Sequence, residues 1–272
     1  MTTDERPPDS ELPPAEEASD SPDAVEDVKD AEDAPRKKRH LAVWQETLLL
    51  LAVAVVLAIV IKALFVQAFY IPSQSMEPGL IENDRILVQK VSYWFGGAPG
   101  RGDVVVFADP DNWLGTEESG PTNPVTKVLA EIGLYPEGGH LVKRVIGVAG
   151  DTITCCDDQG RISVNGQPLD EEGYVADVKG VACNGPMPGS NCEWSAGPVP
   201  EGHLFVMGDN RSMSADSSAP NHLCLPNETD CTKNPYVDVD LVVGKVLAVV
   251  WPSDRFNWLS DPDSFDDVPE PE

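Results

Sequence analysis

The chain has 272 residues, 41% of them hydrophobic, and a formal net charge of −27 at pH 7. This length is enough for one large domain or two small ones with a sizeable buried core. A net charge this negative excludes a general nucleic-acid binder, which needs a basic face, so we expect no nucleic-acid partner.

The first segment is strongly acidic. Residues 1–35 hold 13 acidic and 2 basic residues and almost no large apolar side chains. Such a segment buries too little apolar surface to offset the entropy lost on ordering, which predicts disorder. A dense basic cluster, Arg36–His40, follows. We therefore expect residues 1–40 to form an acidic tail that ends in a basic juxtamembrane cluster.

An apolar run follows the basic cluster. It is unbroken from Leu48 to Ile61, and the wider span from Thr47 to Val66 has 20 residues. A helix of that length crosses roughly 30 Å of hydrocarbon, which predicts a single transmembrane anchor over residues 41–68. The preceding positive charges favour a cytoplasmic N-terminus and an extracytoplasmic remainder in the cell membrane. A cleaved signal peptide is an open alternative, because Val66-Gln67-Ala68 has small residues at the spacing of a cleavage site.

Beyond the anchor, short apolar runs alternate with turn residues, which is typical of β-strands. The strand candidates are residues 85–91, 104–107, 141–148, 161–164, 167–169, 203–207 and 242–251. Asn165-Gly166 joins two of them and predicts a type I′ hairpin. We predict a mainly β fold, with a β domain over residues 69–255, a smaller Cys-containing subdomain at about 152–203, and an acidic tail over 256–272 that is frayed from Asp261 to Glu272.

All six cysteines lie in the second half of the chain, which suits an oxidising compartment. None has the paired spacing with histidines of a zinc module, so we expect no metal or cofactor. We predict the local disulfides Cys183–Cys192 and Cys224–Cys231. Because Cys155 and Cys156 are adjacent, we do not expect them to bond each other. Free buried thiols are the open alternative.

Four short segments carry candidate chemistry: Ile71–Pro78, Gly102–Phe107, Lys143–Gly147 with Gly150-Asp151, and Gly208–Ser217. Alone, each has a structural interpretation as a turn or a solvent-facing strand residue. Together, in this order and after an anchor, they resemble the bacterial type I signal peptidases (leader peptidases). The family's boxes read Ser-x-Ser-Met-x-Pro, Gly-Asp-hydrophobic, Lys-Arg-hydrophobic-Gly with Gly-Asp, and Gly-Asp-Asn-Arg-x-x-Ser-x-Asp-Ser. The resemblance covers about residues 41–255.

The resemblance implies a Ser-Lys dyad serine protease with a LexA-like β fold that removes signal peptides from exported preproteins. It makes Ser75 the nucleophile and Lys143 the general base, while Ser73 and the Ser75 N–H form the oxyanion hole and Ser214 orients the lysine. It further implies cleavage after small residues in an Ala-x-Ala pattern. The residues expected to support the site are Asp209, Arg211 and Asp216. The residues expected to line the substrate pocket are Phe69, Ile71, Met76, Leu80, Ile86, Leu141 and Val142, and ordinary core packing is the alternative for most of them. The departures from the family pattern are Gly79, Ser212-Met213 and Ser218, where Thr, Asp-Asn and Arg are usual.

The implied base is physically reasonable. A serine hydroxyl needs an adjacent base, and a lysine with its ordinary pKa near ~10.4 is protonated at neutral pH. Burial can lower that pKa by ~3–5 units, and Val142, Val145 and Ile146 supply apolar neighbours. Arg144 alternates to the opposite face of the strand. A Ser-His-Asp triad with His203 or His222 is left open by spacing, although neither lies in a nucleophile-elbow context.

Partners follow from the same reasoning. We expect a monomer that contacts preprotein signal peptides and the lipid bilayer, with the substrate added as a strand beside Leu141–Lys143. Aromatic side chains either contact lipid or belong to the core; they are Trp94, Phe95, Trp251, Phe256 and Trp258. Two other functions stay open: an inactive membrane-tethered binding module, and a Ser-Lys peptidase that cleaves itself, as LexA-like repressors do.

Overall fold

The computed structural model describes residues 42–110, 113, 139–176, 183, 187, 192–224 and 232–271. The chain divides into two units by residue contacts, residues 1–46 and 47–272. Of the first unit, the structure describes only the start of a helix, and the predicted disordered tail over residues 1–40 lies outside the described residues.

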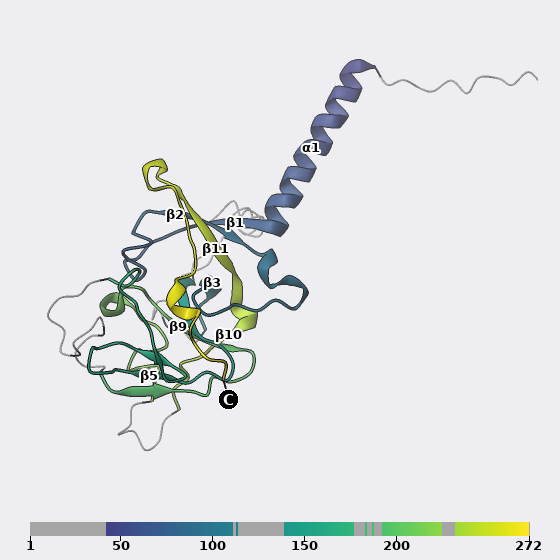
Figure 1. Cartoon of the computed structure of the whole chain (residues 1–272). Helices are drawn as coiled ribbons and strands as arrows, with labels where there is room; N and C mark the ends of the chain where they lie inside the picture. The colour runs from purple at the N-terminus through teal and green to yellow at the C-terminus, as the bar shows by residue number, and fades with distance from the viewer. Residues whose placement is uncertain are drawn as a thin grey trace, which may run out of the picture. The chain divides into compact units, whose positions relative to one another are not determined.

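The helix α1 (Val43–Phe65) is 23 residues long (Figure 1). Leu, Val and Ile side chains are exposed along its described length. Within the described part of the chain it is the one helix long and apolar enough to cross a membrane, judged by length and composition. It ends where β1 (Val66–Tyr70) begins, three residues before the end of the predicted anchor. The backbone becomes extended at this point because residues 66–70 pair with β2 (Arg85–Gln89).

The larger sheet has eight antiparallel strands in the order β1-β2-β11-β3-β4-β9-β10, with β12 paired to β11. Its other strands are β3 (Val104–Ala108), β4 (His140–Gly147), β9 (His203–Met207), β10 (Val237–Asp238), β11 (Val242–Trp251) and β12 (Asn257–Trp258). Five 3₁₀ helices lie among the described residues: η1 (Val91–Gly96), η2 (Arg211–Met213), η3 (Val239–Leu241), η4 (Ser253–Arg255) and η5 (Asp263–Phe265). The mainly β prediction with one N-terminal apolar helix is confirmed.

The larger sheet is apolar on both faces. Val104 and Val106 of β3 pack in one hydrophobic cluster, whereas Val105 and Phe107 pack in another. Successive side chains of a strand point to opposite faces, so the continuous apolar run of β3 is what a strand buried on both sides requires. Strand β3 pairs with β4 from Val104↔Arg144 to Ala108↔His140, which fixes the place of Lys143 opposite Val105.

A smaller four-stranded sheet has the order β7-β6-β5-β8, made of β5 (Ile153–Cys155), β6 (Ser163–Val164), β7 (Gln167–Pro168) and β8 (Trp194–Ala196). It lies in the region predicted as a Cys-containing subdomain (Figure 1). The predicted hairpin is confirmed, because Asn165 and Gly166 join β6 and β7 with φ values of 51° and 80°.

The C-terminal segment differs from the prediction. Phe265 and Val268 are buried in the same cluster as Trp194 and Phe205, so the expectation of a frayed tail was wrong for this stretch. Burial of two large apolar side chains stabilises the segment despite its acidic neighbours. Phe265 and Val268 therefore determine how this segment packs, and its described acidic side chains are exposed.

The cysteines confirm one prediction and correct another. Cys183 is bonded to Cys192, as predicted. Cys155 is bonded to Cys156, so the prediction that these neighbours stay unbonded was wrong. A trans peptide bond holds adjacent Cα atoms about 3.8 Å apart, whereas these two lie 3.0 Å apart across a cis bond. Cys224 is also disulfide-bonded, and its predicted partner Cys231 lies outside the described residues. The alternative of free thiols is wrong for the five described cysteines.

Candidate active site

Ser75 lies in the loop that joins β1 to β2. The side chains of Ile71 and Met76, which flank Ser75 in sequence, are buried and anchor the loop. Backbone hydrogen bonds from Glu77 N to Gln74 O and from Leu80 N to Met76 O close tight turns around the serine. Ser75 itself is buried, so its hydroxyl is held within the protein and not free in solvent.

Lys143 reaches the same place from the middle of β4. Its Nζ atom lies 2.8 Å from Ser75 Oγ and hydrogen-bonds to it, and the lysine is 3% exposed. Burial lowers the pKa of the Lys143 ammonium to about 8, although the negative charges of Asp216 and Asp209 act in the opposite direction. A lysine with this pKa is neutral in a substantial fraction of molecules near pH 8, which a proton acceptor requires.

The two other predicted serines are also near the nucleophile. Ser73 is exposed, and its Oγ atom lies 3.3 Å from Ser75 Oγ. Ser214 lies against Gly208, where an added Cβ atom would overlap both Ser214 Oγ and the Ser75 carbonyl oxygen. Ser214 Oγ is buried and has no hydrogen-bond partner among the described residues, so it does not hydrogen-bond to Lys143, the residue that it is predicted to orient.

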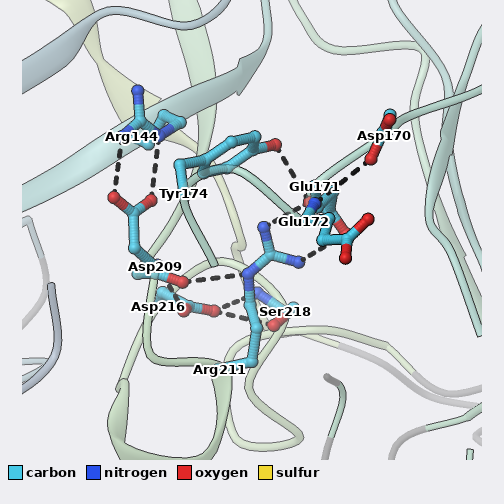
Figure 2. Close-up of polar contacts among 10 residues, drawn as sticks. Arg144, Asp170, Glu171, Glu172, Tyr174, Asp209, Arg211, Asp216 and Ser218 are labelled. Atoms are coloured by element: carbon cyan, nitrogen blue, oxygen red, sulfur yellow. Dashed lines mark hydrogen bonds and ion pairs between the residues drawn. The ribbon is translucent and has the colours of Figure 1, made fainter. Parts of the chain in front are cut away.

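The three predicted supporting residues lie close together (Figure 2): Asp209 is part of the Gly208–Asn210 turn, and Arg211 and Asp216 each form a hydrogen bond with the Gly208 backbone. Asp209 accepts hydrogen bonds from Nε and Nη2 of Arg144 at 2.8 and 2.7 Å. Asp216 accepts hydrogen bonds from the backbone N–H groups of Gly208 and Ser218 and from the Ser218 hydroxyl. Ser218, a departure from the family pattern, thus gives Asp216 two neutral donors where an arginine is usual.

Arg211 has a partner that the sequence did not reveal. Its guanidinium is fully buried and forms an ion pair with Glu171 at 2.5 Å, while its Nε donates to the carbonyl oxygen of Gly208. Tyr174 completes this group: its hydroxyl donates to Glu171, and Arg144 lies 4.5 Å above its ring (Figure 2). The site therefore also includes Glu171, Tyr174 and Arg144, for which the sequence predicted no role.

The predicted pocket residues fall into two groups. Six pack in one hydrophobic cluster beside the Ser75 loop: Phe69, Ile71, Met76, Leu80, Ile86 and Val142. Leu141 packs in the other cluster, with Phe107 and Val145, because it alternates with Val142 along β4. Phe69 and Val142 are the members of the first group that remain half-buried. These two give the cluster its accessible apolar surface.

Neither candidate histidine hydrogen-bonds to a serine hydroxyl in the part of the chain that the structure describes. His222 Nδ1 pairs with the backbone oxygen of Asp216, and the ring stacks on Trp113. His203 Nδ1 pairs with the backbone oxygen of Glu201. Within the described ranges there is also no group of three His, Cys, Asp or Glu residues placed to hold a metal ion.

The aromatic side chains of the β11–β12 hairpin are exposed. Trp251 and Trp258 are 56% and 63% exposed, and Phe256 packs edge-on against Trp258. Trp94 is exposed as well, so core packing is the wrong alternative for these four, whereas the side chain of Phe95 lies outside the described residues. We call Trp251, Phe256 and Trp258 the aromatic hairpin.

Comparisons with known proteins identify the family of the chain. The profile of the family described as "Signal peptidase, peptidase S26" matches residues 44–251. A "Signal peptidase I" of Mycobacterium tuberculosis is 38% identical over 255 residues, which cover 88% of this chain and 83% of the relative. A "Signal peptidase I" of Leptolyngbya laminosa is 30% identical over 265 residues, which cover 97% of this chain and all of the relative. The chain therefore belongs to the signal peptidase family, peptidase S26.

Proposed function

We propose that this protein is a membrane-bound serine endopeptidase that removes N-terminal signal peptides from exported preproteins, with Ser75 as nucleophile and Lys143 as general base. The observation that carries the proposal is the 2.8 Å separation between Lys143 Nζ and Ser75 Oγ, combined with a lysine pKa lowered by burial. A buried amine with a lowered pKa next to a serine hydroxyl is an activated nucleophile.

The reaction proceeds through an acyl-enzyme. The neutral amine of Lys143 accepts the Ser75 proton as Oγ attacks the scissile carbonyl, and the resulting ammonium gives a proton to the leaving amine. The same lysine then activates the water that hydrolyses the ester. The Ser75 N–H and the Ser73 hydroxyl stabilise the oxyanion, a role in which one lost donor typically costs ~10²–10³ in rate.

An extended substrate fits beside β4. Strand β3 pairs with β4 along residues 140–144, whereas β9 pairs with it only from Arg144 onward. The edge of β4 that faces β9 is therefore without a strand partner at Leu141–Lys143, among the described residues. A peptide added at this edge by β-augmentation passes Lys143, and the half-buried Phe69 and Val142 limit the side chains it can carry. Small residues in an Ala-x-Ala pattern suit so shallow an apolar surface.

Membrane attachment places the site near its substrates. Helix α1 serves as a single-pass anchor, and the basic cluster before it favours a cytoplasmic N-terminus and an extracytoplasmic catalytic domain. The aromatic hairpin contacts the bilayer interface, where tryptophan is enriched. A signal peptide held in the same membrane then reaches the site in the plane of the bilayer.

One assay separates this function from its alternatives. Purified full-length protein in detergent is mixed with a preprotein that carries an Ala-x-Ala site, and the products are identified by mass spectrometry. We expect cleavage after the second Ala by the wild type and by Ser195→Ala, whose serine is exposed on the smaller sheet, but not by Ser75→Ala. No cleavage by the wild type would indicate an inactive binding module, and cleavage only within its own chain would indicate a self-cleaving peptidase.

A further inference from the structure

The segment Glu171–Ala176 joins the two loops that carry the proposed chemistry. It follows β7 of the smaller sheet, and its residue Val175 forms a β-bridge with Pro78 of the Ser75 loop. Its residue Ala176 donates a backbone hydrogen bond to the carbonyl oxygen of Asp209 at 3.0 Å. The smaller sheet therefore reaches both loops through one short segment.

Glu171 makes the strongest contact of this segment. Its carboxylate and the Arg211 guanidinium are 5% and 0% exposed, and they form two hydrogen bonds, at 2.5 and 3.3 Å. The carboxylate also accepts a hydrogen bond from Tyr174 at 3.1 Å. Buried charges of this kind are stable only when paired and fully hydrogen-bonded, so the position of Arg211 is determined by Glu171.

Arg211 transmits this constraint to the nucleophile. Its Nε donates to the Gly208 carbonyl oxygen at 2.9 Å, while Asp216 accepts from the Gly208 N–H on the other side. The Gly208 backbone is thus held at both ends where it packs against the carbonyl oxygen of Ser75. The Asn210 N–H also donates a hydrogen bond to the Ser75 carbonyl oxygen at 3.0 Å, which fixes the position of the serine backbone relative to the Gly208–Asn210 turn.

We propose that Glu171 is a positioning residue for the Ser75–Lys143 pair, acting through Arg211 and the Gly208 carbonyl; this inference rests on the proposed protease function. Glu171 touches neither Ser75 nor Lys143 in the described contacts and does not react. It keeps the Gly208–Asn210 turn where the serine requires it. Misplacing reacting groups by about 1 Å can cost roughly 10²-fold in rate, so even a small shift of this turn is measurable.

The test replaces the carboxylate by its neutral isostere in the full-length protein. Glu171→Gln is compared with Glu172→Gln, the same exchange at the next residue, whose side chain is exposed. With the Ala-x-Ala preprotein, we expect kcat per folded molecule to fall about 10- to 100-fold for Glu171→Gln, with KM within about threefold of wild type. The apparent pKa of the reaction stays near 8, because the charges that act on Lys143 are those of Asp216 and Asp209. Glu172→Gln keeps the wild-type kcat.

Each outcome decides the proposal. A folded Glu171→Gln variant with wild-type kcat overturns it while leaving the protease function intact, whereas an inactive wild type overturns the protease function itself. If circular dichroism shows that Glu171→Gln does not fold, Arg211→Lys takes its place, because it keeps the charge and loses the Nε contact to Gly208. A loss of kcat in folded Arg211→Lys supports the proposal, and wild-type kcat overturns it. If neither variant folds, the pair stabilises the whole domain, and a positioning role is overturned.

Discussion

Lys143 Nζ lies 2.8 Å from Ser75 Oγ although 68 residues separate the two in sequence. Lys143 lies in the middle of β4, and Ser75 lies in the loop between β1 and β2. Three strands, β2, β11 and β3, separate β1 from β4 in the sheet. The packing of the Ser75 loop on the sheet, where Ile71 and Met76 join the cluster of Val104 and Val106 of β3, therefore creates the candidate dyad, and not proximity along the chain.

Removing either member of this pair is expected to abolish turnover. Ser75→Ala and Lys143→Ala should each lower kcat by on the order of 10⁴–10⁶, because nucleophile and base act as a unit. The measurement is cleavage of a preprotein in detergent, with Lys90→Ala, a lysine outside the site between β2 and η1, as the matched control. Appreciable turnover by folded Lys143→Ala would refute the dyad.

The rate is expected to depend on pH through the lysine. Burial lowers the pKa of Lys143 to about 8, and only the neutral amine accepts the serine proton, so kcat/KM should rise with pH and level off above about pH 8. Well below that pH, kcat/KM should fall about tenfold per pH unit, because the fraction of neutral Lys143 falls about tenfold per pH unit. Initial rates measured from pH 6 to 10 test this, and a profile that is flat below pH 8 contradicts it.

Asp216 is expected to set part of that pH dependence. Desolvation is the larger influence on Lys143 and lowers its pKa, while the charge of Asp216 raises it. Asp216→Asn removes the charge, so the rise in kcat/KM should move to lower pH even though the maximal rate falls from altered contacts with Gly208 and Ser218. A rise that moves to higher pH, in a variant with a wild-type circular dichroism spectrum, would show that Asp216 acts by another route.

Ser73 is expected to contribute to the transition state and not to folding. Its exposed hydroxyl lies 3.3 Å from Ser75 Oγ, so Ser73→Ala should leave the melting temperature unchanged and lower kcat by about 10²–10³, the usual effect of losing one oxyanion donor. Ser73→Thr, which keeps a hydroxyl, should retain more activity than Ser73→Ala. Equal rates for the two variants would argue against an oxyanion role.

The aromatic hairpin is expected to contact lipid. In vesicles that contain lipids with brominated acyl chains, the fluorescence of Trp251 and Trp258 should be quenched, because both side chains are exposed beside the hairpin turn. The contribution of each is obtained by comparing full-length wild type with Trp251→Phe and Trp258→Phe. Trp194, buried in the core of the smaller sheet, is the unquenched reference. Quenching of Trp194 but not of Trp258 would contradict the membrane contact.

The sequence predicted the features that depend on local patterns. Helix α1 follows from an unbroken apolar run, and the hairpin at Asn165-Gly166 follows from the positive φ values that its turn requires. Ser75 and Lys143 were found through the order of four motifs, and the structure places them in contact. In each of these cases the relevant information lies within about 20 adjacent residues or in a recognisable motif.

The sequence did not predict what depends on distant partners. Glu171 carries no motif, and its importance appears only when the chain brings it to Arg211, 40 residues away. Leu141 is a different case: it was assigned to the pocket through resemblance, although strand alternation, which the sequence does encode, places it on the face of β4 opposite Val142. The C-terminal segment was expected to be frayed because of its acidic composition, whereas Phe265 and Val268 attach it to the core cluster of Trp194 and Phe205. Such contacts are set by tertiary packing, which composition and periodicity do not encode.

The backbone at position 208 leaves almost no freedom for sequence change. Any Cβ there would overlap the Ser75 carbonyl oxygen and the hydroxyl of Ser214, and part of this obstacle is main chain that cannot rotate away. Libraries that randomise the Gly208–Ser217 box and select for secretion should therefore return glycine at this position and diversity at the exposed Ser212, Met213 and Ala215. An engineer who wishes to retune the enzyme would gain more by varying those three positions than by varying the turn that supports the serine.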